Sequence, residues 1–329
     1  MKISVIATVL NEGPSIQRLL ESLAGQSRPP DEVVIVDGGS TDGTVPEMRA
    51  WAAAGRLPVK IVVRPGANIS QGRNAAIGAA TGDVIASTDA GVRLEPDWLE
   101  ALAAPFESEE GARVQVVSGW FVADPQTLFE TAMGATVLPR RREVKVESFL
   151  PSSRSVAFRR AAWTAAGGYP EWLDYCEDLV FDLKLRELYG PFPFEPMARV
   201  HFRPRGNLCA FWKQYYHYAR GDGKADLWRR RHTIRYLTYL VLLPGLVALA
   251  LHHSPLWWLA LALGVAAYTA SPYRRLWPSL AGYSWPERIK ALLLVPVIRV
   301  VGDCAKMVGY PVGKLWRRRN RHRAEVQWR

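Results

Sequence analysis

Three polar residues each stand at or just after the end of an apolar run with β-strand character: Thr8, Asp37 and Asp89. A carboxylate at the carboxyl end of an apolar strand lies where open α/β sheets bind ligands, in the crevice beyond the strand ends. A single aspartate in such a place can equally cap a turn or the next helix. Because three separate runs show the same feature, the pattern predicts a ligand site with Asp89 at its centre.

An acidic pair, Glu177-Asp178, begins a run with the pattern of a helix over residues 176–187. A carboxylate at a helix N-terminus near a bound substrate is a suitable general base. The same acidity is also ordinary at a helix start, because the helix dipole stabilises negative charge there.

A short stretch after the last predicted strand, residues 201–205, offers further polar candidates. His201 is a possible metal ligand, although a capping or core histidine fits as well. Arg203 and Arg205 could hold a diphosphate or a lipid phosphate, or they could face solvent or lipid headgroups.

The first ninety residues contain the elements needed to position these groups. Apolar runs predict strands, and the segments between them have helical patterns, for example the apolar face Ile16, Leu19, Leu20 and Leu23. Such alternation predicts an α/β fold with a doubly wound, mostly parallel sheet and right-handed crossovers. The carboxyl ends of parallel strands share one edge, so Thr8, Asp37 and Asp89 are expected to meet there. The predicted strands span residues 2–8, 32–36, 59–63 and 83–87. The polar stretch 127–148 is expected to be a flexible or amphipathic excursion.

Four motifs in the same order as in a known family carry a resemblance. They are residues 4–12 (SVIATVLNE), 36–44 (VDGGSTDGT), 87–91 (STDAG) and the pair Glu177-Asp178. Together they resemble the family 2 glycosyltransferases with the GT-A fold, a Rossmann-like α/β fold, over residues 1–220. The resemblance implies that Thr8, Glu12 and Asp37 contact the nucleotide base or ribose, that Arg73 is a basic residue of the nucleotide pocket, and that Asp89 is the first aspartate of the DxD motif.

The resemblance also implies a reaction, an inverting transfer of a sugar from a nucleotide-sugar. Asp178 matches the proposed catalytic base, with Glu177 beside it. A hard divalent cation, Mn²⁺ or Mg²⁺, can offset charge on the leaving diphosphate through oxygen ligands. Asp89 would supply one such ligand and His201 a possible second. The chain departs from the family at Gly38, where many members have a second aspartate, and at Gly91, where the DxD motif has its second aspartate.

The charge is distributed unevenly along the chain, which carries +11 overall. Residues 199–329 contain 23 Lys and Arg but 5 Asp and Glu, and residues 236–273 contain none of these four types. Two apolar segments of this length with basic flanks predict a membrane hairpin, about 236–251 and 256–273, with both ends in the cytoplasm. A buried helical pair in a soluble domain is the alternative. Residues 287–310 suit an interfacial helix, and the basic tail after them suits anionic headgroups.

These patterns predict two domains, a GT-A domain over 1–226 and a membrane region over 227–329. The predicted protein is a cell-membrane glycosyltransferase with its catalytic domain on the cytoplasmic face. Its donor would be a UDP- or GDP-sugar, and its acceptor lipid-linked, a polyprenyl phosphate or a polysaccharide of the cell envelope. A non-catalytic nucleotide-binding scaffold is the alternative.

A nucleic-acid partner is not expected, because no nucleic-acid-binding module is evident. The three cysteines, Cys176, Cys209 and Cys304, form no CxxC pair and leave one over, which indicates reduced thiols inside a cell and no structural zinc. The N-terminus does not resemble a signal peptide.

Overall fold

The computed structural model describes residues 1–328, and the chain folds into two compact units. The first unit comprises residues 1–124 and 141–203, and the second residues 125–140 and 204–329. Residues 204–226 pack with the C-terminal helices in the second unit.

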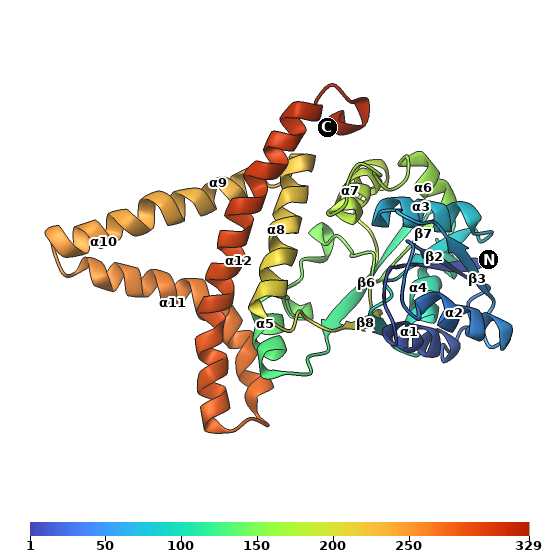
Figure 1. Cartoon of the computed structure of the whole chain (residues 1–329), viewed down its shortest axis with the longest axis horizontal. Helices are drawn as coiled ribbons and strands as arrows, with labels where there is room; N and C mark the ends of the chain where they lie inside the picture. The colour runs from blue at the N-terminus through green and yellow to red at the C-terminus, as the bar shows by residue number, and fades with distance from the viewer. Residues whose placement is uncertain (329) are drawn as a thin grey trace. The chain divides into compact units, whose positions relative to one another are not determined.

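The first unit is built on one mixed sheet of eight strands in the order β3-β2-β1-β4-β7-β6-β8-β5 (Figure 1). Its first four strands are mutually parallel, whereas β7 runs antiparallel to both β4 and β6. The predicted α/β class with a mostly parallel sheet is confirmed. The strands are β1 (Ile3–Val9), β2 (Glu32–Asp37), β3 (Val59–Val63), β4 (Val84–Ser87), β5 (Val92–Leu94), β6 (Val116–Ala123), β7 (Val156–Arg159) and β8 (Phe194–Phe202).

Alternation along the strands divides the core into two layers, one on each side of the sheet. In β1, Ile3, Val5 and Ala7 face one hydrophobic cluster and Ile6 faces the other. Helices α1 (Ser15–Ala24), α2 (Thr44–Ala53) and α4 (Trp98–Glu107) cover the first layer, and α3 (Ile69–Ala79), α6 (Arg160–Ala165) and α7 (Glu177–Tyr189) cover the second. This layering leaves the carboxyl ends of β1, β2 and β4 together at one edge.

The second unit is helical. It contains α5 (Leu128–Val137), α8 (Leu208–Ala225), α9 (Arg229–Leu237), a π-helical turn η3 (Thr238–Leu242), α10 (Leu243–His252), α11 (Trp257–Leu276) and α12 (Trp285–Asn320). The stretch 127–148 is expected to be a flexible or amphipathic excursion, and the flexible alternative is wrong for its first half, which forms the helix α5. That helix begins at Thr127, whose side chain accepts a hydrogen bond from the Glu130 backbone N–H, and it buries Ala132 and Met133 against α8 and α12.

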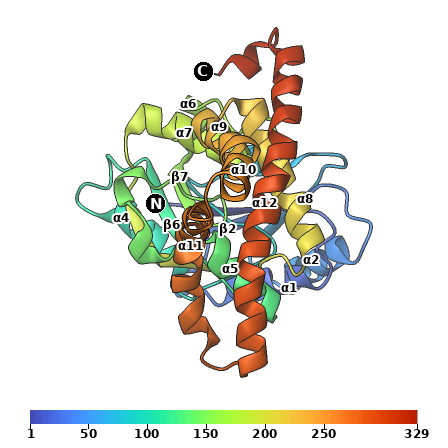
Figure 2. The same ribbon diagram turned by 90° about the vertical axis from the view of Figure 1, so that its left-hand side faces the viewer.

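Helices α8 and α12 run against each other with their backbones in close contact (Figures 1 and 2). A Cβ atom added to Gly309 would lie 2.2 Å from the Tyr216 carbonyl oxygen, and one added to Gly313 would lie 2.1 Å from that of Arg220. Only glycine permits this approach.

The apolar segments form a helical hairpin, in which α10 packs along α11 (Figure 1). Within the described part of the chain, one helical run, Arg229–His252, is long and apolar enough to cross a membrane, and 6% of its apolar window is buried. Large apolar side chains on it are exposed, Leu240 to 64% and Leu251 to 64%. A helix of this kind lacks the protein cover that a core helix has.

Candidate active site

The ends of β1 and β2 place two of the predicted residues side by side, since Thr8 pairs in register with Val36 and Val9 with Asp37. Helix α3 lies directly over Thr8, because a Cβ atom added to Gly72 would come within 2.8 Å of the Thr8 Cγ2 atom. Asp37 is fully buried, and its Oδ1 atom accepts hydrogen bonds from the backbone N–H groups of Gly39 and Ser40, both at 2.9 Å. Asp37 therefore shapes the glycine turn at this edge.

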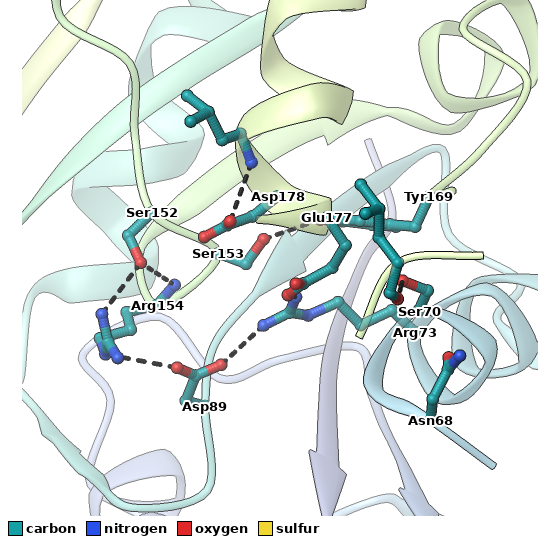
Figure 3. A network of polar contacts seen from close by, with 12 residues as sticks. Asn68, Ser70, Arg73, Asp89, Ser152, Ser153, Arg154, Tyr169, Glu177 and Asp178 are labelled. Carbon is teal, nitrogen blue, oxygen red and sulfur yellow. Dashed lines mark hydrogen bonds and ion pairs between the residues drawn. The ribbon is translucent and has the colours of Figure 1, made fainter. Parts of the chain in front are cut away.

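Arg73 of α3 contacts two carboxylates of the site (Figure 3). It is almost completely buried, and its Nη1 atom donates to Glu177 Oε1 at 2.5 Å while Nη2 donates to Asp89 Oδ1 at 2.9 Å. The centre of the Tyr169 ring lies 5.3 Å from the guanidinium carbon. One buried cation thus ties the loop after β4 to the N-terminus of α7.

A second guanidinium, that of Arg154, contacts the same carboxylate (Figure 3). Its Nε atom lies 3.3 Å from Asp89 Oδ2, and its Nη1 atom donates to Ser152 Oγ at 3.2 Å. Both oxygens of Asp89 therefore face cations. The sequence analysis missed Arg154, because it lies in an irregular segment before β7, and the only local signal was an arginine among serines.

The backbone is unusual at Cys176, the residue directly before the acidic pair. Its φ of 64° lies in the left-handed region that residues other than glycine seldom adopt. The preceding loop is tied to α3, because Ser70 Oγ donates to the Leu173 carbonyl at 3.0 Å and Asn74 Nδ2 to that of Tyr169 at 2.9 Å. These bonds fix where α7 begins and hence where its first two side chains point.

The two carboxylates of the pair point in different directions. Glu177 is buried and points at Arg73, whereas Asp178 is partly exposed and points away from Arg73 (Figure 3). Asp178 Oδ1 accepts a hydrogen bond from the Leu179 backbone N–H at 2.8 Å. Burial raises the pKa of Glu177, repulsion from Asp178 raises it further, and Arg73 opposes both. Of the pair, Asp178 is the carboxylate open to a ligand.

Asp182, one turn further along α7, is a buried acid that the sequence analysis did not single out. It is 2% exposed, and its Oδ2 atom has no hydrogen-bond partner among the described residues. Burial raises its pKa well above the ordinary value, and the charge of Asp178 adds to this effect.

We expect Asp182→Asn to flatten the dependence of stability on pH. The folded protein holds the Asp182 proton more tightly than the unfolded chain, so the free energy of unfolding falls as the pH rises from about 4 towards the raised pKa, by up to about 1.4 kcal/mol per pH unit. Urea denaturation between pH 4 and 8 measures this slope. Glu187→Gln, an exposed change on the same helix, is the control, and an unchanged slope in Asp182→Asn would contradict the expectation.

The other predicted site residues are Glu12, His201, Arg203 and Arg205. Glu12 Oε2 accepts a hydrogen bond from Ser15 Oγ at 2.7 Å, and a Cβ atom added to Gly91 would lie 3.9 Å from that oxygen. His201 of β8 contacts Glu95 through its Nε2 atom. Arg203 and Arg205 are both exposed, the first at the end of the first unit and the second in the second unit.

The donor set for a divalent cation is small. Among residues 1–328, no group of three or more His, Cys, Asp and Glu side chains is placed to hold a metal ion. Asp89 is 26% exposed at its side chain and can offer a carboxylate oxygen, in competition with Arg73 and Arg154. These residues fit a cation that takes one protein ligand and the rest of its shell from a diphosphate and water.

The chain also resembles known proteins in sequence. Residues 4–164 match the model of glycosyl transferase family 2. The chain is 27% identical over 244 residues to the succinoglycan biosynthesis protein ExoA of Rhizobium meliloti, which covers 69% of this chain and 70% of that protein. It is 27% identical over 280 residues to the N-acetylglucosaminyl-diphospho-decaprenol L-rhamnosyltransferase of Mycobacterium tuberculosis, which covers 70% and 88%.

Among solved structures, a similar fold occurs in the mannosyltransferase PcManGT from Pyrobaculum calidifontis, in complex with GDP-Man and Mn²⁺. The TM-score is 0.57 at 22% sequence identity, with 96% of this chain and 87% of that chain covered. The sheet and its edge thus define a protein with the GT-A glycosyltransferase fold. The chain carries a family 2 glycosyltransferase domain over residues 4–164.

Proposed function

We propose that this glycosyltransferase moves a sugar, with inversion, from a UDP- or GDP-sugar to a lipid-linked, polyprenyl phosphate or polysaccharide acceptor of the cell envelope. The observation that carries the proposal is the separation of roles at the edge of the sheet. Arg73 engages Glu177 and Asp89, while Asp178, in the same first turn of α7 as Glu177, stays partly exposed. Asp178 is therefore available to accept a proton, whereas Glu177 and Asp89 are paired with arginine.

In the proposed reaction, Asp178 accepts the proton of the acceptor hydroxyl as that oxygen attacks the anomeric carbon from the face opposite the diphosphate. The bond from the anomeric carbon to the diphosphate breaks, and the configuration inverts. The Arg154 guanidinium stabilises the charge on the leaving group, since charge-assisted hydrogen bonds to phosphate are strong. Thr8 and Glu12 line the nucleotide side, and the buried Asp37 holds the glycine turn beside them. A bound Mn²⁺ or Mg²⁺, held through Asp89, would supply further positive charge to the diphosphate.

The names of the relatives support the acceptor class. One is a succinoglycan biosynthesis protein, and another is a rhamnosyltransferase named for a diphospho-decaprenol acceptor. Both point to envelope glycans, and the second to a lipid-linked acceptor.

A thermal-shift panel of UDP, GDP, CMP and TDP, each with and without Mn²⁺, tests the donor class. We expect one nucleotide to raise the melting temperature only with the cation, because a ligand that binds the folded state stabilises it, and we expect its sugar conjugates to be turned over. Nucleotide binding without metal dependence, and without transfer from any sugar in the panel, would instead favour a non-catalytic scaffold.

We propose further that residues 227–329 attach the enzyme to the cytoplasmic face of the cell membrane, through the hairpin 236–251 and 256–273 and the helix around 287–310. We expect the pair Leu242→Asp and Leu251→Asp to reduce flotation with liposomes at least tenfold. Each leucine is more than half exposed on the apolar run, and an aspartate costs about 3 kcal/mol in a membrane-spanning helix. Leu188→Asp on α7, where the leucine is also more than half exposed, is the control. Equal flotation of all three proteins would contradict membrane attachment through this run.

A further inference from the structure

The second unit contains a cavity of about 470 Å³ that plays no part in the proposed transfer chemistry. Helices α8, α9, α11 and α12 and the turn η3 supply most of its wall. Its volume is within the range of small-molecule sites. Five cationic side chains line it among the described residues, against one carboxylate, Asp303; the cations are Arg231, Arg235, Arg275, Arg299 and Lys306.

The single carboxylate is already engaged on several sides. Asp303 accepts hydrogen bonds from Arg235 Nε at 2.7 Å, from the Tyr268 hydroxyl at 2.6 Å and from the Tyr239 hydroxyl at 3.2 Å. The Lys306 Nζ atom lies 3.9 Å from the same group. One negative charge shared in this way leaves the cavity strongly positive.

One cation of the cavity, Arg299 of α12, is incompletely satisfied by the protein. Its Nε atom is buried and has no hydrogen-bond partner among the described residues, and its guanidinium carbon lies 4.0 Å from the centre of the Tyr268 ring. A buried donor without a partner is costly, so its presence in a cavity points to an anionic ligand that completes it. Burial also lowers the pKa of Lys306 to about 8, against the opposing charge of Asp303, and a bound anion would favour the charged form of this side chain.

The elements that line the cavity also carry exposed apolar side chains. Leu237, Leu240 and Val241, on α9 and η3, are 54%, 64% and 62% exposed, and Leu263 of α11 is 62% exposed. Arg231 and Arg235 stand at the beginning of the apolar run Arg229–His252, the place where arginines meet lipid headgroups at the end of a membrane helix. A cationic chamber beside apolar helices suits a ligand with an anionic head and an apolar chain.

We propose that this cavity, the Arg299 pocket, binds the phosphate monoester or diphosphate head of a long-chain lipid, whose apolar chain lies along η3 and α11. The inference rests on the membrane attachment proposed above. It adds a lipid site within the second unit, separate from the residues assigned to sugar transfer.

Binding of hexadecyl phosphate to the full chain in neutral detergent, measured by titration calorimetry, tests the proposal. We expect the pair Arg299→Met and Lys306→Met to weaken binding about 100-fold, since each change removes a charge-assisted contact. Arg231→Gln, at an exposed position of α9, should weaken binding about tenfold without disturbing the fold. The control is the pair Arg318→Met and Arg319→Met, two exposed residues of the same long helix, which should bind like the wild type.

Two further ligands separate the sources of the phosphate. Inorganic pyrophosphate should bind at least tenfold more weakly than hexadecyl phosphate, and phosphatidylglycerol in the same micelles should not displace it. Equal binding of pyrophosphate would make the pocket a site for soluble anions, and full displacement by phosphatidylglycerol would make it a site for bulk phospholipid. Either result, or unchanged binding in both pocket variants, overturns the proposal. Nucleotide-induced thermal shifts of the same variants should stay at the wild-type value, so loss of lipid binding is distinguishable from loss of the donor site.

Discussion

Replacement of Asp178 by asparagine is expected to lower the turnover of sugar transfer by about 10²–10⁴-fold, the usual contribution of a positioned general base. Asparagine keeps the size and the acceptor oxygen that receives the Leu179 backbone N–H, so the start of α7 should remain in place. It cannot take a proton from the acceptor hydroxyl. Affinity for the nucleotide, measured by thermal shift or calorimetry, should stay within about twofold of the wild type, because removing a transition-state interaction lowers turnover and not ground-state binding.

The same substitution type on the far end of α7 provides the control. Glu187→Gln also exchanges a carboxylate for an amide at an exposed position, and it should leave turnover unchanged. A wild-type rate in Asp178→Asn would remove this residue from the mechanism. Glu177 would not readily replace Asp178 as the base. Glu177 is buried, and its carboxylate already accepts a hydrogen bond from the Arg73 guanidinium.

Local patterns were enough to predict the first half of the fold. The apolar face of α1 and the alternation of β1 are properties of adjacent residues, and the parallel order follows because short strand–helix–strand units have one favoured handedness. Residues 114–202 were harder. β7 inserts antiparallel between β4 and β6, and its neighbours are chosen by contacts between segments far apart in sequence, which no local period records.

The site shows the same division. Motif positions singled out Asp89, Glu177 and Asp178, but the arginines that contact Asp89 and Glu177 come from elsewhere in the chain. Arg73 lies 104 residues from Glu177, and Arg154 contacts Asp89 from an irregular segment. The sequence likewise did not indicate the roles of Gly309 and Gly313, where α8 and α12 approach closely. A close backbone approach depends on the positions of both helices, which no local pattern records.

Replacement of Arg73 by methionine is expected to lower the free energy of unfolding by about 3–5 kcal/mol, the usual cost of removing one partner from a buried ion pair. Arg73 is 3% exposed and holds both Glu177 and Asp89, so its loss leaves Glu177 charged and buried without its cation. The loss should grow with pH. Burial already raises the pKa of Glu177, and without Arg73 the folded state binds its proton still more tightly, so stability falls as the pH rises from about 4.5 towards the raised pKa.

A double-mutant cycle separates this electrostatic account from simple loss of packing. Glu177→Gln removes the stranded charge, so the double variant Arg73→Met with Glu177→Gln should recover part of the loss at pH 8 and little of it at pH 5. Urea denaturation of the four proteins at both pH values measures the coupling between the two residues. If the losses in the free energy of unfolding simply add and do not change with pH, Arg73 stabilises the fold by packing, and not by neutralising the charge of Glu177.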